Sequence, residues 1–89
     1  MTWDEPKRLA NLDAHGLDFS DVERFDWSNA LIRESYRGKH GERRFQAIGS
    51  LVGRLVSVIF APLGTEAIAV ISLRAASPKE RKLHADRQA

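Results

Sequence analysis

The spacing of apolar residues divides the chain near residue 30 into a helical part and a strand part. Before that point apolar residues recur every three or four positions, as one buried face of a helix requires. Pro6 fits the first turn of a helix and Gly16 fits its end, so we expect a helix between them. Phe19, Val22 and Phe25 then follow at three-residue spacing, which predicts a second helix.

Four segments after residue 30 have the pattern of β-strands. The first two alternate loosely, whereas the last two are almost continuously apolar, as central strands buried on both faces are. The predicted strands are 30–36, 43–49, 55–60 and 67–73. Short connections containing glycine separate them, so neighbouring strands should run antiparallel. Trp3 lies in a short segment that fits a clipped edge strand, and Ser77, Pro78 and Glu80 match the start of a capped helix.

These elements predict an α+β fold: N-terminal helices packed on a four-stranded or slightly larger antiparallel sheet, with a short C-terminal helix. The length fits a single domain over residues 1–89. The sheet face without helices must be polar or covered by a partner. Trp3, Phe19, Phe25 and Trp27 are many large apolar residues for so small a core. We therefore expect them to build an exposed apolar patch that a protein partner or a second copy of the chain covers.

Cysteine is absent, which excludes disulfides and thiolate metal sites and suits a reducing cytoplasm. The N-terminus is polar and acidic, which argues against a signal peptide. The longest apolar stretch, residues 55–63, is too short to cross a bilayer. We expect a cytoplasmic protein without a membrane partner.

The charge is distributed unevenly along the chain. Residues 1–29 hold seven acids and three bases, net −4, and residues 30–89 hold eleven bases and five acids, net +6. A basic region of this kind is typical of nucleic-acid binders, but it is also common in other proteins. Charge alone therefore leaves nucleic-acid binding open.

The strand region is rich in arginine and poor in acids, which suits one kind of phosphate chemistry. RNA can be cleaved by its own 2′-hydroxyl when a protein supplies a base, an acid and cations for the phosphorus centre. Metal hydrolases instead need convergent carboxylates or histidines. The three histidines lie on separate segments without ligand spacing. We expect no metal site and no cofactor.

Arginines are the candidate phosphate ligands, and Arg74 and Arg44 are the first choices for catalysis. Arg74 ends an apolar strand, where it can bind a phosphate with two hydrogen bonds or pair with Glu66 or Glu80; spacing leaves both interpretations open. Arg43 and Arg44 are adjacent on one strand and should point to opposite faces. Arg43 shares its face with a large apolar residue, so Arg44 is preferred and Arg43 is secondary, unless both are solvated edge charges.

His15 and His84 are the candidate groups for proton transfer, since imidazole titrates near neutral pH. His15 precedes the glycine that ends the first helix, and its position alone favours an electrostatic interaction with the helix C-terminus over a role in catalysis. His84 lies in the polar last helix, where simple exposure is the alternative. Arg43, Arg54 and Lys79 complete the set as expected RNA-binding residues.

Three stretches of the sequence resemble the BrnT toxin family, in the family's order and over nearly the whole chain. They are Trp3-Asp4-Glu5-Pro6-Lys7 with Asn11, His15-Gly16 and Phe19; Glu42-Arg43-Arg44-Phe45 running to Ala47-Ile48-Gly49; and Val70-Ile71-Ser72-Leu73-Arg74-Ala75 followed by Glu80-Arg81. The resemblance implies a compact antiparallel sheet similar to RelE-type ribonucleases. It implies a toxin of a type II toxin–antitoxin system that cleaves RNA and inhibits translation.

The resemblance also implies partners. A BrnA-type antitoxin, with a ribbon-helix-helix DNA-binding part, would neutralise the toxin and repress the shared operon. The toxin would then reach operator DNA only through this antitoxin, in a toxin–antitoxin heterotetramer, and it could also form a homodimer.

The chain departs from the family pattern at three positions. Ala69 stands where the family often has arginine, Leu63 where it often has a charged residue, and His84 where tyrosine is frequent. Two further hypotheses therefore remain beside the ribonuclease. The chain is either a catalytically weakened toxin that holds the antitoxin and tunes operon repression, or a plain nucleic-acid-binding domain without an antitoxin.

Overall fold

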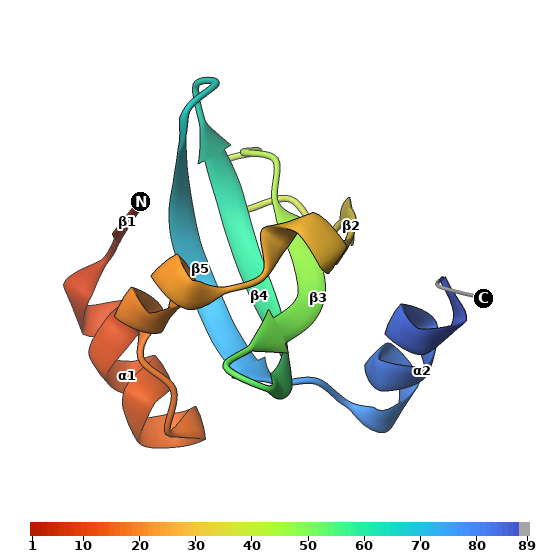
Figure 1. The fold of residues 1–89 in the computed structure, drawn as a ribbon. Helices are drawn as coiled ribbons and strands as arrows, with labels where there is room; N and C mark the ends of the chain where they lie inside the picture. The colour runs from red at the N-terminus through yellow and green to blue at the C-terminus, as the bar shows by residue number, and fades with distance from the viewer. Residues whose placement is uncertain (88–89) are drawn as a thin grey trace.

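The computed structural model describes residues 1–87 and has the predicted α+β architecture (Figure 1). Its elements follow in the order β1 (Thr2–Trp3), α1 (Glu5–His15), the 3-10 helices η1 (Phe19–Arg24) and η2 (Trp27–Asn29), β2 (Leu31–Glu34), β3 (Phe45–Leu51), β4 (Arg54–Leu63), β5 (Ala67–Ala75) and α2 (Pro78–Asp86). None of the helices in the described part of the chain is long and apolar enough to cross a membrane.

The sheet has five strands in the order β1-β5-β4-β3-β2. Strands β2 to β5 pair antiparallel, as their short connections require. Strand β1 pairs parallel to β5, with Thr2 opposite Ala69 and Trp3 opposite Val70. Five strands fit the expected four or slightly more, but the expectation of a purely antiparallel sheet is corrected to a mixed one. The long path from β1 to β5 through the rest of the fold permits the parallel pairing.

The predicted second helix is a 3-10 helix, η1, rather than an α-helix. The side chain of Asp18 caps it by accepting a hydrogen bond of 3.0 Å from the backbone of Ser20. A 3-10 helix has three residues per turn, which is the spacing of Phe19, Val22 and Phe25. These three side chains are buried in the core.

The bounds of all four predicted strands differ from those observed, and two of the differences change the interpretation of named residues. Strand β3 begins at Phe45, so Arg43 and Arg44 lie just before it. Strand β4 continues through Pro62 to Leu63. Pairing between β3 and β4 ends at Phe60, so Pro62 has a neighbouring strand only in β5, and its missing N–H does not interrupt a second ladder.

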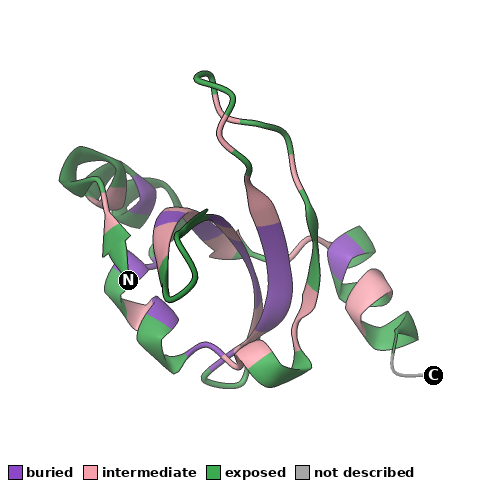
Figure 2. Ribbon diagram, turned by 90° about the horizontal axis from the view of Figure 1, so that it is seen from above, coloured by how far each residue is buried: buried purple, intermediate pink, exposed green. Residues whose placement is uncertain are grey.

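The hydrophobic core lies on one face of the curved sheet, and Figure 2 shows α2 on the other side, away from α1. The core contains Phe19, Val22, Phe25 and the inward side chains of β3, β4 and β5. The predicted exposed patch is wrong for Phe19 and Phe25, which are 0% and 5% exposed. Trp3 and Trp27 are half-buried and pack against the edge of the core.

Candidate functional site

The face of the sheet opposite the core carries polar side chains. Arg33 lies opposite Gln46 in the β2–β3 register, and Ser57 lies opposite Arg74 in the β4–β5 register. Directly paired residues share a face of a sheet. Helix α2 follows β5 and places Glu80 over this same face, where it bonds to Gln46 and Arg74. We call these five residues the polar network.

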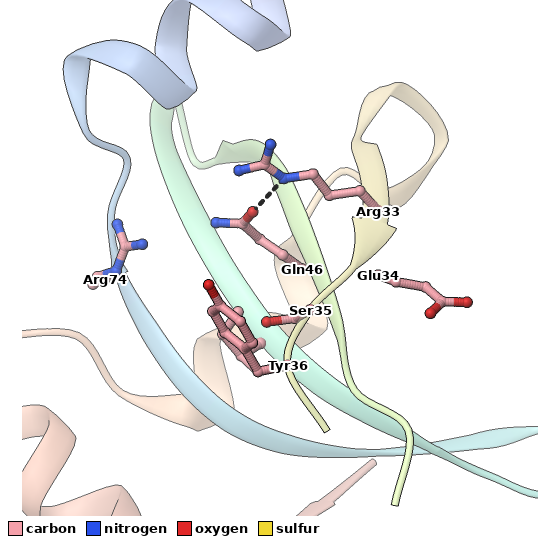
Figure 3. Close-up of a pocket in the computed structure, with 7 residues that line it drawn as sticks. Arg33, Glu34, Ser35, Tyr36, Gln46 and Arg74 are labelled. Carbon is pink, nitrogen blue, oxygen red and sulfur yellow. Dashed lines mark hydrogen bonds between the residues drawn. The ribbon is translucent and has the colours of Figure 1, made fainter. Parts of the chain in front are cut away.

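An open hollow of about 590 Å³ lies beside the polar network (Figure 3). Its lining residues come from β2 and the segment after it, from β3, β4 and β5, and comprise Arg33, Glu34, Ser35, Tyr36, Gln46, Ile59 and Arg74. In Figure 3 the Arg33 side chain reaches across β3 toward Gln46, and Arg74 stands on the far strand. Tyr36 is 93% exposed, so its ring is free to meet a ligand.

Arg74 and Glu80 form a two-bond ion pair. Arg74 donates from both terminal nitrogens to the two carboxylate oxygens of Glu80, each at 2.8 Å. Of the two acids considered from the sequence, Glu80 rather than Glu66 is the partner. The Arg74 hydrogen bonds lower the pKa of Glu80 to about 2, against the opposing effect of burial, and the same bonds raise the pKa of Arg74. Glu80 therefore stays ionised and is a poor proton acceptor near neutral pH.

The start of α2 holds the Glu80 carboxylate in place. Glu80 occupies position N3 of the helix and forms a capping box with Ser77. Its side chain accepts a hydrogen bond of 2.9 Å from the Ser77 backbone N–H, and its own backbone N–H donates to the Ser77 hydroxyl at 3.2 Å. The predicted helix cap thus also fixes the anion that pairs with Arg74.

Gln46, which is 6% exposed, links Arg33 to Glu80, the partner of Arg74. Its Oε1 accepts a hydrogen bond of 2.7 Å from Arg33 Nε, drawn as the dashed line in Figure 3. Its Nε2 donates to Ser57 Oγ at 2.8 Å and to Glu80 Oε2 at 2.7 Å. The result is a continuous chain of hydrogen bonds from Arg33 through Gln46 and Glu80 to Arg74.

The side chains of Arg43 and Arg44 have different contacts. Arg43 lies over the Phe45 ring, with 5.0 Å from its guanidinium carbon to the ring centroid, and pairs with Glu34. Arg44 pairs with Glu42 at 3.1 Å and is 24% exposed at its side chain. Its Nε is buried without a hydrogen-bond partner among the described residues. Neither arginine lines the hollow.

The remaining predicted residues are spread over the molecule. His15 ends α1 and is exposed, on the other side of the sheet from α2 (Figure 1). His84 lies on α2, with Nε2 3.1 Å from the backbone oxygen of Asn29. A carbonyl only accepts, so this contact is a hydrogen bond in the tautomer that carries the proton on Nε2. Arg87 Nη2 also lies 3.5 Å from the same nitrogen, and that contact needs the other tautomer. Arg54 and Lys79 are exposed, at the starts of β4 and α2, and do not line the hollow.

Sequence reasoning missed the central members of the polar network. Arg33 and Gln46 were not selected, although a register drawn for the hairpin of residues 30–36 and 43–49 would have brought them together. Glu80 was recognised only as a helix cap and a possible partner of Arg74. No feature of the sequence indicated a role for Ser57, because this residue lies in an almost continuously apolar strand.

The charges of this face favour an anion. Arg33, Arg74 and Glu80 sum to a net +1 on the polar network, and guanidinium groups bind phosphate and carboxylate through paired N–H donors. In residues 1–87, no group of three or more His, Asp or Glu side chains is arranged to hold a metal ion. The arrangement can therefore bind a phosphate and offset the negative charge that develops on it.

Comparison with known proteins identifies the family. The family described as "Ribonuclease toxin, BrnT, of type II toxin-antitoxin system" matches residues 3–80, which include the whole polar network. The structure is similar to the crystal structure of the Brucella abortus ribonuclease toxin BrnT, with a TM-score of 0.71 and 41% sequence identity over 86% of this chain and 95% of that chain. No curated protein sequence matches the chain. These two matches confirm the resemblance seen in the sequence: the chain belongs to the BrnT family of ribonuclease toxins of type II toxin–antitoxin systems.

Proposed function

We propose that this toxin is an endoribonuclease that cleaves RNA by attack of the substrate's own 2′-hydroxyl, without a metal ion. The 2′-oxygen forms a bond to the adjacent phosphorus while the bond from phosphorus to the 5′-oxygen breaks. One proton leaves the 2′-hydroxyl and one reaches the departing 5′-oxygen. The products are a 2′,3′-cyclic phosphate and a 5′-hydroxyl.

The observation that carries the proposal is that two guanidinium groups, those of Arg33 and Arg74, line one open hollow on the polar face. Cations fixed around a reacting phosphate offset the negative charge that grows as the 2′-oxygen attacks. Arg74 is held on β5 by a two-bond ion pair, so it needs little reorganisation when the charge develops. We assign it the stabilisation of the transition state.

Other predicted residues take supporting roles in the proposal. Arg44 is a second cation for the RNA chain, with Arg43, Arg54 and Lys79 as contacts farther out. His84 is the preferred proton carrier, because it lies on α2, the helix that also supplies Glu80 to the polar network. His15, on the other side of the sheet, is the less favoured candidate for that role.

We further propose that the fold is related to that of RelE-type ribonucleases. The proposed neutralising partner is a BrnA-type antitoxin whose ribbon-helix-helix part binds operator DNA. Membership of a type II toxin family supports an antitoxin partner in general. An open apolar groove of about 420 Å³, lined by residues that include Met1, Trp27, Ile32 and Ile68, offers a surface that such a partner can cover.

A second candidate is a weakened toxin that mainly holds the antitoxin and regulates the operon. Glu80 already occupies both terminal nitrogens of Arg74, and Ala69 stands where the family often has another arginine. Growth arrest on induction of the chain alone would distinguish a working ribonuclease from this candidate.

The test of the proposed function uses the purified chain and single-stranded RNA of mixed sequence. We expect cleavage to survive an excess of chelator and to leave fragments ending in a 2′,3′-cyclic phosphate or its 3′-phosphate product. Loss of cleavage with chelator, restored by a divalent ion, would refute the metal-free mechanism. Absence of any cleavage together with tight binding of the antitoxin would favour the second candidate.

A further inference from the structure

We propose that Arg33 binds the RNA phosphate in the hollow, and that Gln46 positions the Arg33 guanidinium. The proposal rests on the proposed ribonuclease function and names the group that binds the substrate at that site. It departs from the sequence prediction, in which Arg74 and Arg44 were the phosphate ligands and Arg33 had no role.

The free hydrogen-bonding capacity of the polar network lies on Arg33. Its Nε donates to Gln46, and this is its one hydrogen bond within residues 1–87. No ion pair to Arg33 occurs among those residues. A guanidinium has five N–H donors, so the two terminal nitrogens retain their paired donors for a ligand. The side chain is exposed and lines the hollow, where a phosphate can approach it.

The terminal nitrogens of Arg74, in contrast, already have a partner. Its two terminal nitrogens face the two oxygens of Glu80, and the pair has no net charge. A phosphate that approached Arg74 first would have to share it with a carboxylate that keeps its own negative charge. The excess positive charge of the polar network therefore resides on Arg33, and a ground-state phosphate should bind there.

The Gln46 amide can hold Arg33 in one orientation only. Arg33 can donate but not accept, so it needs the amide oxygen, and the ionised Glu80 can accept but not donate, so it needs the amide nitrogen. A flipped amide would lose both bonds inside a buried site. Gln46 thus ties the Arg33 guanidinium to the helix start that fixes Arg74, and sets the distance between the two cations.

Binding to an RNA that cannot be cleaved tests the proposal separately from activity. The probe is a single-stranded oligonucleotide of mixed sequence with 2′-O-methyl groups, titrated at several salt concentrations. We expect Arg33→Ala to weaken binding about tenfold or more, since a hydrogen bond to a charged group is lost. It should also reduce the salt dependence by about one phosphate contact. Arg24→Ala is the matched control, because Arg24 is an exposed arginine on η1 that pairs with Asp21.

Gln46→Leu tests the positioning role, because it keeps both arginines and removes their link. We expect weaker binding with an unchanged salt dependence, and no further loss when Gln46→Leu is added to Arg33→Ala. A residue with a merely structural role would weaken binding equally in both backgrounds. Thermal unfolding of each variant identifies any that fails to fold, and the Arg33→Ala measurement then decides alone.

The outcomes are distinguishable. If Arg33→Ala binds the oligonucleotide as the wild type does, the Arg33 assignment is overturned even if the protein cleaves RNA. If Arg74→Ala weakens binding more than Arg33→Ala, the assignment is also overturned. Failure of the wild type to cleave unmodified RNA would instead remove the proposed function, whatever the binding results.

Discussion

Asn11 pairs with Leu73 through the hydrogen bonds that a neighbouring strand would otherwise make. Its Oδ1 accepts from the Leu73 backbone at 3.1 Å, and its Nδ2 donates to the Leu73 oxygen at 2.8 Å and to the Leu17 oxygen at 3.0 Å. The side chain is buried. It supplies hydrogen-bond partners to β5 at Leu73, beyond the two residues of β5 that pair with β1. Helix α1 is thereby joined to the residue that precedes Arg74.

Replacing Asn11 should destabilise the fold. Asn11→Ala leaves backbone groups of Leu73 and Leu17 without their partner, and an unsatisfied buried polar group costs about 1–3 kcal/mol. We expect a loss of roughly 2–4 kcal/mol in the free energy of unfolding, measured by urea denaturation. Asp13→Ala, at an exposed position of α1, is the control and should change stability little. Equal stability of the two variants would contradict the role given to Asn11.

Acid should weaken the attachment of α2. The pKa of Glu80 is lowered from 4.5 to about 2, so the ionised form is favoured by the fold. The corresponding stability is fully present above the unfolded pKa near 4.5 and is lost as pH falls through about 2. We expect Glu80→Gln to be less stable than the wild type at pH 7, by on the order of 2–3 kcal/mol.

The measurement is the free energy of unfolding of both proteins between pH 7 and pH 2. The difference between them should stay constant down to about pH 4.5 and shrink below it, because the wild type then loses its ionised carboxylate too. Other acids with lowered pKa values, such as Asp18 and Asp26, are common to both proteins. A difference that stays constant over this range would rule out the ion pair as its cause.

Arg74→Ala should depress turnover far more than RNA binding. The guanidinium meets its strongest charge only in the transition state, and removing such a donor typically lowers the rate by on the order of a hundredfold or more. Single-turnover cleavage and binding of the uncleavable oligonucleotide measure the two effects. Unfolding must be measured as well, because the variant leaves Glu80 without its main partner. Cleavage at the wild-type rate would remove Arg74 from the active site, and Arg24→Ala again serves as the control.

Tyr36 should contribute to binding by stacking on a base. Its ring is almost fully exposed beside the hollow, and a base stacked on an aromatic ring contributes about 1–3 kcal/mol. We expect Tyr36→Ala to weaken binding of single-stranded RNA at least severalfold, and Tyr36→Phe to keep the wild-type affinity. Stability should be the same in both variants. Equal affinity of all three proteins would show that the ring takes no part.

The order of the elements could be predicted because local patterns encode it. The proline and glycine at the ends of α1, the capping box at Ser77 and the alternation in the strands depend on residues close together in sequence. The family could be predicted from short stretches that keep their order along the chain. Even the 3-10 form of η1 was present in the three-residue spacing, although that spacing was interpreted as an α-helix.

The sequence by itself determined the hairpins, the helix ends, the basic character of the strand region and the presence of arginines near the sheet. Only the tertiary structure decided which arginine is neutralised and which is free. Arg74 had Glu66 and Glu80 as alternatives, and the path of α2 over the sheet selected Glu80. Asn11 and Leu73 are 62 residues apart, and Gln46 and Glu80 are 34 apart. Such partnerships depend on strand register and packing between distant segments, because hydrogen bonds act over about 3 Å in space, whatever the separation in sequence.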